Sequence, residues 1–211
     1  GYAEGIKDGI VSGDDALIYL ETIIDESKKM GKLVSNMLEL SKLESGVIKP
    51  QFEIFNINRL INNVVNKLKP DCLEKNLKIE FSPKTEYSYV NADVFQMEQV
   101  LTNVITNAIK YTPKNNDIKI SIEDVDKDYF NISILNTGTS IPEGENINLF
   151  DKFYKLDKSR NRKSNSTGLG LSIVKNILDL HNFKYDLRNV HDGVLFEFFL
   201  KKAEIDDIED I

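Results

Sequence analysis

Two asparagines and a lysine stand at helical spacing between Gln99 and Tyr111. Asn103 and Asn107 are four residues apart and Lys110 follows three residues later, so a helix would place all three side chains on one face. Asn is a poor helix former, so two of them inside a helix need a reason. Carboxamide oxygens suit Mg²⁺, and a lysine can hold a phosphate as a point charge. The alternative is a pair of solvated asparagines on an outer face.

A glycine pair leads directly into an apolar segment in the run Ser166-Thr167-Gly168-Leu169-Gly170-Leu171. Glycines let a backbone approach a ligand closely, and the following helix would present free N–H groups at its positive dipole end. This combination predicts a phosphate-binding loop. The run has neither the lysine of a P-loop nor the glycine spacing of a dinucleotide-binding fold, and a Gly-x-Gly pair alone more often marks a simple turn.

A third polar run follows a predicted strand. It reads Asn136-Thr137-Gly138-Thr139-Ser140-Ile141-Pro142, and Leu149-Phe150-Asp151-Lys152-Phe153-Tyr154 comes after it. An amide at the end of a strand, beside a glycine turn, can read the edge of a nucleotide base. The basic stretch 155–163 could fold over phosphates as a lid, and the alternative is a solvated charged loop.

Taken in chain order, these runs resemble the four nucleotide-binding boxes of sensor histidine kinases. The run 99–111 resembles the N box, 136–142 the G1 box, 149–154 the F box and 166–171 the G2 box. The wider fold of that family is shared with gyrase, Hsp90 and MutL ATPases, and the match covers about residues 50–201. The resemblance implies an α+β fold, the two-layer α/β sandwich known as the Bergerat ATP-binding fold, preceded by a truncated antiparallel helical hairpin. It implies a partial dimerisation and histidine-phosphotransfer hairpin in residues 1–46, an ATP-binding catalytic domain in 47–202 and an acidic tail in 203–211.

The same resemblance implies ATP and Mg²⁺ as ligands. Asn107 would coordinate the metal with help from Asn103, Lys110 would contact phosphate, and Tyr111 would lie against the adenine. The implied nucleotide-binding residues are Asn103, Asn107, Lys110, Tyr111, Asn136, Gly138, Thr167, Gly168, Leu169, Gly170 and Leu171. The residues implied to act on the transferred phosphoryl group are Asn103, Lys110, Lys155 and Arg160.

Three positions depart from the wider pattern. Asn136 stands where the family usually has an aspartate that accepts from the adenine amino group, and Ser140 stands where the second G1 glycine usually falls. An amide oxygen can still accept that hydrogen bond, but without charge assistance, so both changes concern base affinity more than fold. In the ATPase relatives a glutamate one turn before the metal asparagine activates water. Here Asn103 takes that place and cannot act as a base, so we expect phosphoryl transfer to a histidine instead of hydrolysis.

The acceptor histidine of this family, followed by Glu or Asp and a Pro, is not found in the chain. The two histidines, His181 and His191, fit a helix C-terminus and a turn, so we expect the acceptor upstream of Gly1 and no self-phosphorylation by this chain. The implied partners are a response regulator and a second copy through the hairpin. Membrane contact would come only through upstream segments, which makes this the cytoplasmic portion of a plasma-membrane protein. The shape of the G1 box and lid resembles a Gram-positive group that includes cell-envelope and glycopeptide-resistance sensors.

Two other functions remain open. One is an ATPase of the gyrase and Hsp90 type that uses hydrolysis to drive a conformational change. The other is a non-catalytic module that binds nucleotide or only dimerises, which the changes at Asn136 and Ser140 would favour.

Composition limits the partners. The 211 residues carry a net charge of −7, which argues against nucleic-acid binding. The single cysteine, Cys72, fits a reducing compartment as a buried structural thiol. No run approaches the roughly 18 apolar residues of a membrane helix, and no His, Cys or acidic cluster has the spacing of a structural metal site.

Periodicity predicts the elements that must position these residues. We expect helices over 14–43, 58–68, 93–111 and 169–180, strands over 52–55, 78–81, 87–91, 118–123 and 130–135, and a final hairpin turning at 191–193. Asp93 and Gln96 form a capping-box pattern at the start of the third helix. The first helix carries a narrow apolar seam (Leu20, Ile23, Met30, Val34 and Met37) that predicts a partner helix ending in residues 1–12. The alternative is an amphipathic helix that lies on the rest of the protein.

Overall fold

The central sheet is built from strands in which alternate side chains are buried. Its strands run in the order β2 (Lys78–Pro83), β4 (Asp117–Asp124), β5 (Tyr129–Thr137), β7 (Gly193–Lys201) and β6 (Tyr185–Val190). β2 is parallel to β4 and the other neighbours are antiparallel, so the sheet is mixed. The computed structural model describes residues 1–85, 87–145, 148–156 and 167–203.

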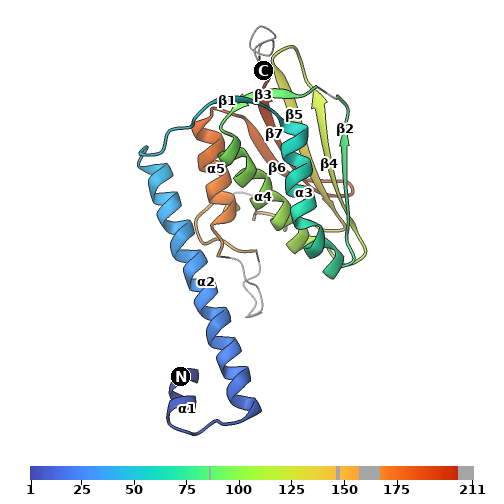
Figure 1. The fold of residues 1–211 in the computed structure, drawn as a ribbon. Coiled ribbons are helices and arrows are strands. Elements are labelled where there is room, and N and C mark those ends of the chain that lie inside the picture. The colour runs from blue at the N-terminus through green and yellow to red at the C-terminus, as the bar shows by residue number, and fades with distance from the viewer. Residues whose placement is uncertain (86, 146–147, 157–166, 204–211) are drawn as a thin grey trace.

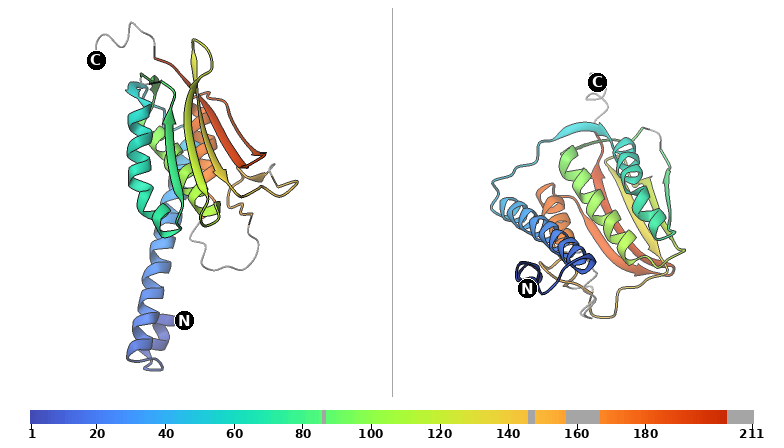
Figure 2. Two further views of the ribbon diagram at one scale, coloured as in Figure 1. Left: turned by 90° about the vertical axis from the view of Figure 1, so that its right-hand side faces the viewer. Right: turned by 60° about the horizontal axis from the view of Figure 1, so that its bottom comes forward.

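Three helices cover one face of this sheet (Figures 1 and 2). They are α3 (Ile57–Glu74), α4 (Val94–Tyr111) and α5 (Gly170–Leu180). The strands turn an apolar row toward them, which includes Ile118, Ile120, Ile122, Ile132, Ile134, Phe196 and Phe198, all at most 2% exposed. The arrangement confirms the predicted α+β class and its two-layer sandwich.

A small second sheet links the sandwich to the N-terminal helices. β1 (Glu53–Asn56) pairs antiparallel with β3 (Tyr89–Ala92). Before it, α1 (Tyr2–Lys7) folds back on α2 (Asp14–Glu44), and the rings of Tyr2 and Tyr19 meet edge to face at 4.8 Å. The predicted antiparallel hairpin is therefore present, with a short first arm.

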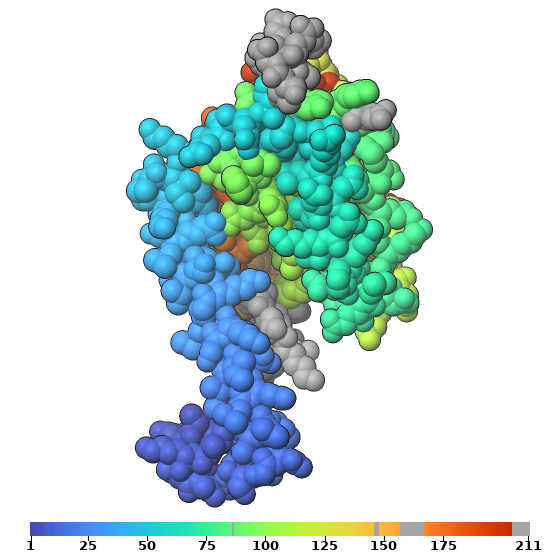
Figure 3. All heavy atoms as spheres, in the orientation of Figure 1, coloured from blue at the N-terminus to red at the C-terminus, as the bar shows by residue number. Residues whose placement is uncertain are grey.

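The apolar seam of α2 is buried only at its C-terminal end. Leu40 and Leu43 join the main core, and α2 packs against α5 there. The upstream half of α2 projects beyond the sandwich (Figure 3), and Met30, Val34 and Met37 are each about half exposed or more. The expected amphipathic packing on the rest of the protein is thus found at the C-terminal end of α2. The seam expected to need a partner helix is left uncovered at the other end. None of the helices within the described ranges is long and apolar enough to cross a membrane.

Most predicted elements are confirmed, with shifted boundaries. The second predicted helix continues past Leu68 to Glu74, through Pro70, and its last turns bury Cys72. Burial raises the pKa of the Cys72 thiol, which agrees with a structural role. The segment 148–154, which contains the run from Leu149 to Tyr154, consists of successive turns.

The start of α4 differs from the predicted capping box. Asp93 is the N-cap, and its carboxylate accepts from the backbone N–H of Gln96. The reciprocal bond from Gln96 is not made, because the backbone N–H of Asp93 donates to Nε2 of His181 at 3.1 Å. Nδ1 of His181 must then carry the proton, which it donates to the carbonyl of Ile177 at 2.8 Å. A buried neutral histidine therefore joins the end of α5 to the start of α4.

Burial lowers the pKa of His181 from its usual 6.5, although the bond to Ile177 and the charge of Asp93 act in the opposite direction. At a pH between the folded-state pKa and 6.5, His181 is therefore protonated in the unfolded chain and neutral in the folded chain. We predict that the contribution of His181 to stability is complete above a pH of about 7 and decreases as the pH falls from about 6.5 through the folded-state pKa. Urea denaturation between pH 5 and 8 measures this slope.

In His181→Gln the slope should become shallower. His191→Gln is the comparison, because Asp192 raises the pKa of the exposed His191, so that its replacement should steepen the slope or leave it unchanged and should not make it shallower. An unchanged slope in His181→Gln would contradict this account of the α4–α5 junction.

Candidate functional site

A cavity of about 1430 Å³ opens between α4, the segment that begins α5, the sheet and the C-terminal half of α2. Its described lining contains five lysines, namely Lys32, Lys49, Lys75, Lys110 and Lys155. The acidic side chains in that lining are Glu39, Asp93 and Glu98. The cavity is therefore locally basic in a chain of net charge −7, which suits an anionic ligand.

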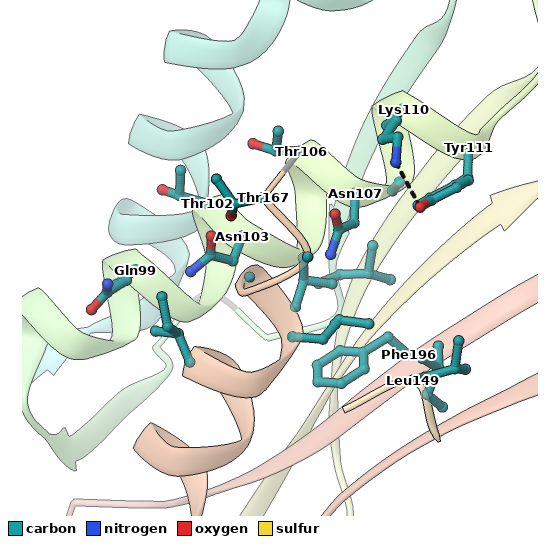
Figure 4. Close-up of a pocket in the computed structure, with 18 of the residues that line it drawn as sticks. Gln99, Thr102, Asn103, Thr106, Asn107, Lys110, Tyr111, Leu149, Thr167 and Phe196 are labelled. Atoms are coloured by element: carbon teal, nitrogen blue, oxygen red, sulfur yellow. Dashed lines mark hydrogen bonds between the residues drawn. The ribbon is translucent and has the colours of Figure 1, made fainter. Parts of the chain in front are cut away.

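One face of α4 presents amides to this cavity, as Figure 4 shows. Asn103 and Asn107 point toward the start of α5, and a Cβ placed on Gly170 would lie 3.4 Å from Oδ1 of Asn103 and 3.8 Å from Nδ2 of Asn107. The opposite face of α4 buries Met97, Val100, Leu101, Val104, Ile105, Ala108 and Ile109. The apolar packing of α4 therefore aims both amides at the first turn of α5, where helix N–H groups have no intrahelical partner.

The C-terminal end of α4 carries two more cavity residues. Nζ of Lys110 donates to the hydroxyl of Tyr111 at 2.6 Å and lies 4.1 Å from the centre of its ring. Lys75, which was not among the predicted site residues, donates from Nζ to the carbonyls of Ile109 and Lys110 at 2.7 Å each. Burial and the nearby charge of Lys110 lower the pKa of Lys75. Lys75 thus holds the last turn of α4 and adds positive charge to this end of the cavity.

The sheet supplies an apolar floor with one polar position. Ile134, Leu187, Val194 and Phe196 line the cavity from β5, β6 and β7. Asn136, near the end of β5, lines it beside them and is 9% exposed. The loop after β5 is held in place by Asn189 of β6, which was also not predicted. Its amide accepts from the N–H of Ile141 at 2.7 Å and donates to the carbonyl of the same residue at 2.8 Å.

The glycine loop before α5 is fixed by its neighbours. Gly168 has a φ of +75°, and a Cβ there would lie 2.8 Å from the carbonyl carbon of Phe153. The N–H of Phe153 donates to the carbonyl of Gly168 at 2.9 Å. From the other side, Nδ2 of Asn36 on α2 donates a long bond of 3.4 Å to the hydroxyl of Thr167. The glycine loop therefore lies between the segment around Phe153 and the helix α2.

Ten of the predicted site residues line the cavity together. They are Asn103, Asn107, Lys110, Tyr111, Asn136, Lys155, Thr167, Gly168, Gly170 and Leu171. Gly138 does not, because its Cα faces Asn116, where a Cβ would lie 2.5 Å from Oδ1. The side chain of Leu169 is also absent from the lining and is fully buried in the core. Arg160 lies outside the described residues.

Comparison with known proteins agrees with this geometry. Residues 92–204 match the family described as histidine kinase-, DNA gyrase B- and HSP90-like ATPase. Residues 1–46 match the His Kinase A (phospho-acceptor) domain. The chain belongs to the histidine kinase family.

Among its relatives in this family is the sensor protein SrrB of Staphylococcus aureus (strain N315), 33% identical over 208 residues. That match covers 97% of this chain and 35% of SrrB, so the chain spans about a third of the length of this relative. The catalytic domain of the histidine kinase ThkA is 35% identical with a TM-score of 0.64, over 72% of this chain and 96% of that domain. The structure of ThkA in complex with the response regulator TrrA is 29% identical with a TM-score of 0.75, over 96% and 57% of the two chains.

We predict that Gly168→Ala destabilises this histidine kinase chain. The added methyl meets the backbone of Phe153, and alanine resists a positive φ, so the free energy of unfolding should fall by about 1–3 kcal/mol. Gly31→Ala is the matched control, because Gly31 lies inside α2 with nothing within 4 Å of its Cβ position. That variant should be neutral or slightly more stable in the same urea titration. Equal effects would show that the glycine loop is not held as described.

Lys75→Met should also lower the free energy of unfolding, by about 1–3 kcal/mol, since two carbonyls of α4 lose a charged donor. Lys69→Met is the control, because Lys69 is exposed on α3, the helix that Lys75 follows as C-cap, and its effect should stay within about 0.5 kcal/mol. Chemical denaturation compares the two. If Lys75→Met behaves like Lys69→Met, Lys75 does not hold the end of α4.

Proposed function

We propose that this chain is the catalytic region of a two-component sensor histidine kinase, which binds Mg-ATP in the cavity beside α4. Its chemistry is transfer of the γ-phosphoryl group to a histidine outside the chain, and from there to an aspartate of a response regulator. The observation that carries the proposal is the meeting of Asn103 and Asn107 with the start of α5 at Gly170. This meeting places two amides, with Oδ1 of Asn103 nearest, beside free helix N–H groups, and a 180° rotation of the Asn107 amide would present a second hard oxygen ligand for a metal–phosphate complex.

The residues present fit Mg-ATP. No group of three or more His, Cys, Asp or Glu side chains that could hold a metal is found in the described part of the chain. A Mg²⁺ ion would be bound by the amide of Asn107, with Asn103 assisting, and by the phosphates of the nucleotide, since carboxamide and phosphate oxygens suit this ion. When bound, Mg²⁺ neutralises charge on the phosphates during transfer. The absence of a side chain at Gly170 lets the backbone at the start of α5 approach the amide of Asn103, since a Cβ there would already lie 3.4 Å from Oδ1.

The remaining residues would divide the nucleotide between them. The N–H groups around Gly168 and Gly170 would hold the phosphates, and Lys110 and Lys155 would add charge near them. Tyr111 would lie against the base, and the amide of Asn136 would contact its edge on the apolar floor that includes Phe196. Three expectations from the sequence stay predictions: the division into three parts at residues 46 and 202, the role of Arg160, and the placement among cell-envelope sensors.

The site is suited to holding the γ-phosphoryl group and poorly suited to hydrolysing it. Asn103 is a neutral amide and cannot deprotonate water. Of the three acids in the described lining, Asp93 already accepts from the N–H groups of Gln96 and Gln51. The nucleophile must then be brought in by another segment. For this reason an ATPase of the gyrase and Hsp90 type is the second candidate function. A measurement of steady-state ATP turnover separates it from the histidine kinase.

The helical hairpin gives the partners of this proposal. The half-exposed seam of α2 suits a second copy of the chain, which would bury it in a four-helix arrangement. The related ThkA has been captured with its response regulator, and we propose the same class of partner here. The contact of Asn36 with Thr167 brings the hairpin next to the glycine loop. We place the chain on the cytoplasmic side of a membrane-anchored sensor.

Calorimetric titration with ATP, with and without Mg²⁺, tests the proposal on the unchanged chain and on Asn107→Ala. Loss of the amide oxygen should weaken Mg-ATP binding at least tenfold, which corresponds to about 1.4 kcal/mol. Asn63→Ala is the control, because Asn63 is exposed on α3, away from the cavity. ATP hydrolysis by the unchanged chain should stay negligible. Absence of binding in every condition, or rapid turnover, would contradict the proposal.

A further inference from the structure

The side chain of Asn136 occupies a position that the pattern of its strand assigns to an apolar residue. On β5 the buried side chains are Phe130, Ile132, Ile134 and Asn136, which share the face covered by the helices. Its neighbour across the ladder on β7 is Val194, which is also buried. An amide has therefore been placed in an apolar row, at the point where that row becomes the floor of the cavity.

This amide is buried and has no protein partner. Within the ranges that the structure describes, no hydrogen bond to the side chain of Asn136 is found, and the side chain is 9% exposed. The polar atoms of Asn136 are not among the fully buried side-chain atoms that lack a partner in the described ranges, so the amide keeps its hydrogen-bonding capacity for whatever fills the cavity. Because Asn136 lines the cavity, a ligand can supply the missing partners. The amide is thus the polar group that meets the base.

The chemistry of that amide sets which bases it accepts. A carboxylate at neutral pH only accepts hydrogen bonds, so it favours an amino group opposite and repels an oxo group. A carboxamide has an accepting oxygen on one arm and a donating NH₂ on the other, and rotation by 180° exchanges them. It can therefore accept from a 6-amino group or donate to a 6-oxo group. The hydroxyls of Thr139 and Ser140, on the same side of the cavity, can also both donate and accept.

We infer that the base subsite of this chain accepts 6-oxopurine nucleotides as well as adenine nucleotides, because Asn136 reads position 6 without preferring a donor. The inference rests on the proposed function, since it assigns the specificity of the same nucleotide site. A site that rejects a ligand by its hydrogen-bond pattern can discriminate by about 10⁴-fold, and an amide that fits both patterns removes this rejection. The expected ratio of the Kd values for ITP and ATP is within about tenfold.

The test is calorimetric titration of the chain with Mg-ATP and with Mg-ITP. These two nucleotides differ in the base at positions 6 and 1, so the 2-amino group of guanine does not enter the comparison. The variant is Asn136→Asp, which should still bind ATP because a carboxylate accepts from the 6-amino group. Its ITP/ATP ratio should rise at least tenfold over that of the unchanged chain. Asn62→Asp adds the same charge on an exposed position of α3 and should leave the ratio unchanged.

The outcomes separate this inference from the proposed function. If the unchanged chain binds neither nucleotide, the proposed function fails and the inference falls with it. If it binds ATP but binds ITP more than about tenfold more weakly, only the inference is overturned. If both nucleotides bind and Asn136→Asp leaves their ratio unchanged, Asn136 does not read position 6 and the inference is likewise overturned. ATP binding by Asn136→Asp serves as its own check that the variant has folded.

Discussion

The packing of α4 on the sheet is the constraint on which the site depends. One face of this helix buries seven apolar side chains, so the opposite face, with Asn103 and Asn107, has a fixed direction. Both ends of the helix are held by distant residues, by His181 at the first turn and by Lys75 at the last. A small rotation of α4 would move both amides away from Gly170 and would also disturb the core. Stability and ligand geometry are therefore properties of the same helix.

In the proposed function, the charges and amides that line the cavity favour phosphoryl transfer over hydrolysis. Lysines gather around it in an acidic chain, which draws in an anionic ligand, while the amides can bind a metal without acting as bases. The acceptor must therefore be brought to the phosphoryl group. α2 already lies along this cavity, with Asn36 at the glycine loop and Glu44 paired to Lys152 at 2.7 Å. The helix that belongs to the phospho-acceptor match thus contacts the loop that would hold the phosphates.

Local pattern predicted most of the elements and named ten residues that line one cavity, because each pattern depends on spacing along one segment. The sandwich, the amide face of α4 and the glycine loop were all expected from the sequence. Lys75 and Asn189 were missed because they act on segments about 35 and 48 residues away, where no periodicity shows them. The capping box failed for the same reason, since His181, 88 residues along the chain, takes the N–H that Gln96 was expected to accept. Gly138 is not part of the cavity lining, and from sequence alone a glycine at a turn with positive φ cannot be distinguished from a ligand-binding glycine.

The most direct test of this account is to crystallise the chain with ATP and Mn²⁺ in place of Mg²⁺ and to locate the metal by its anomalous scattering. The account predicts one strong peak bonded to the side-chain oxygen of Asn107, between α4 and the first turn of α5. It also predicts that the base lies over Phe196 with its edge at Asn136. A metal peak away from Asn107, or a nucleotide bound outside this cavity, would contradict the assignment of the site.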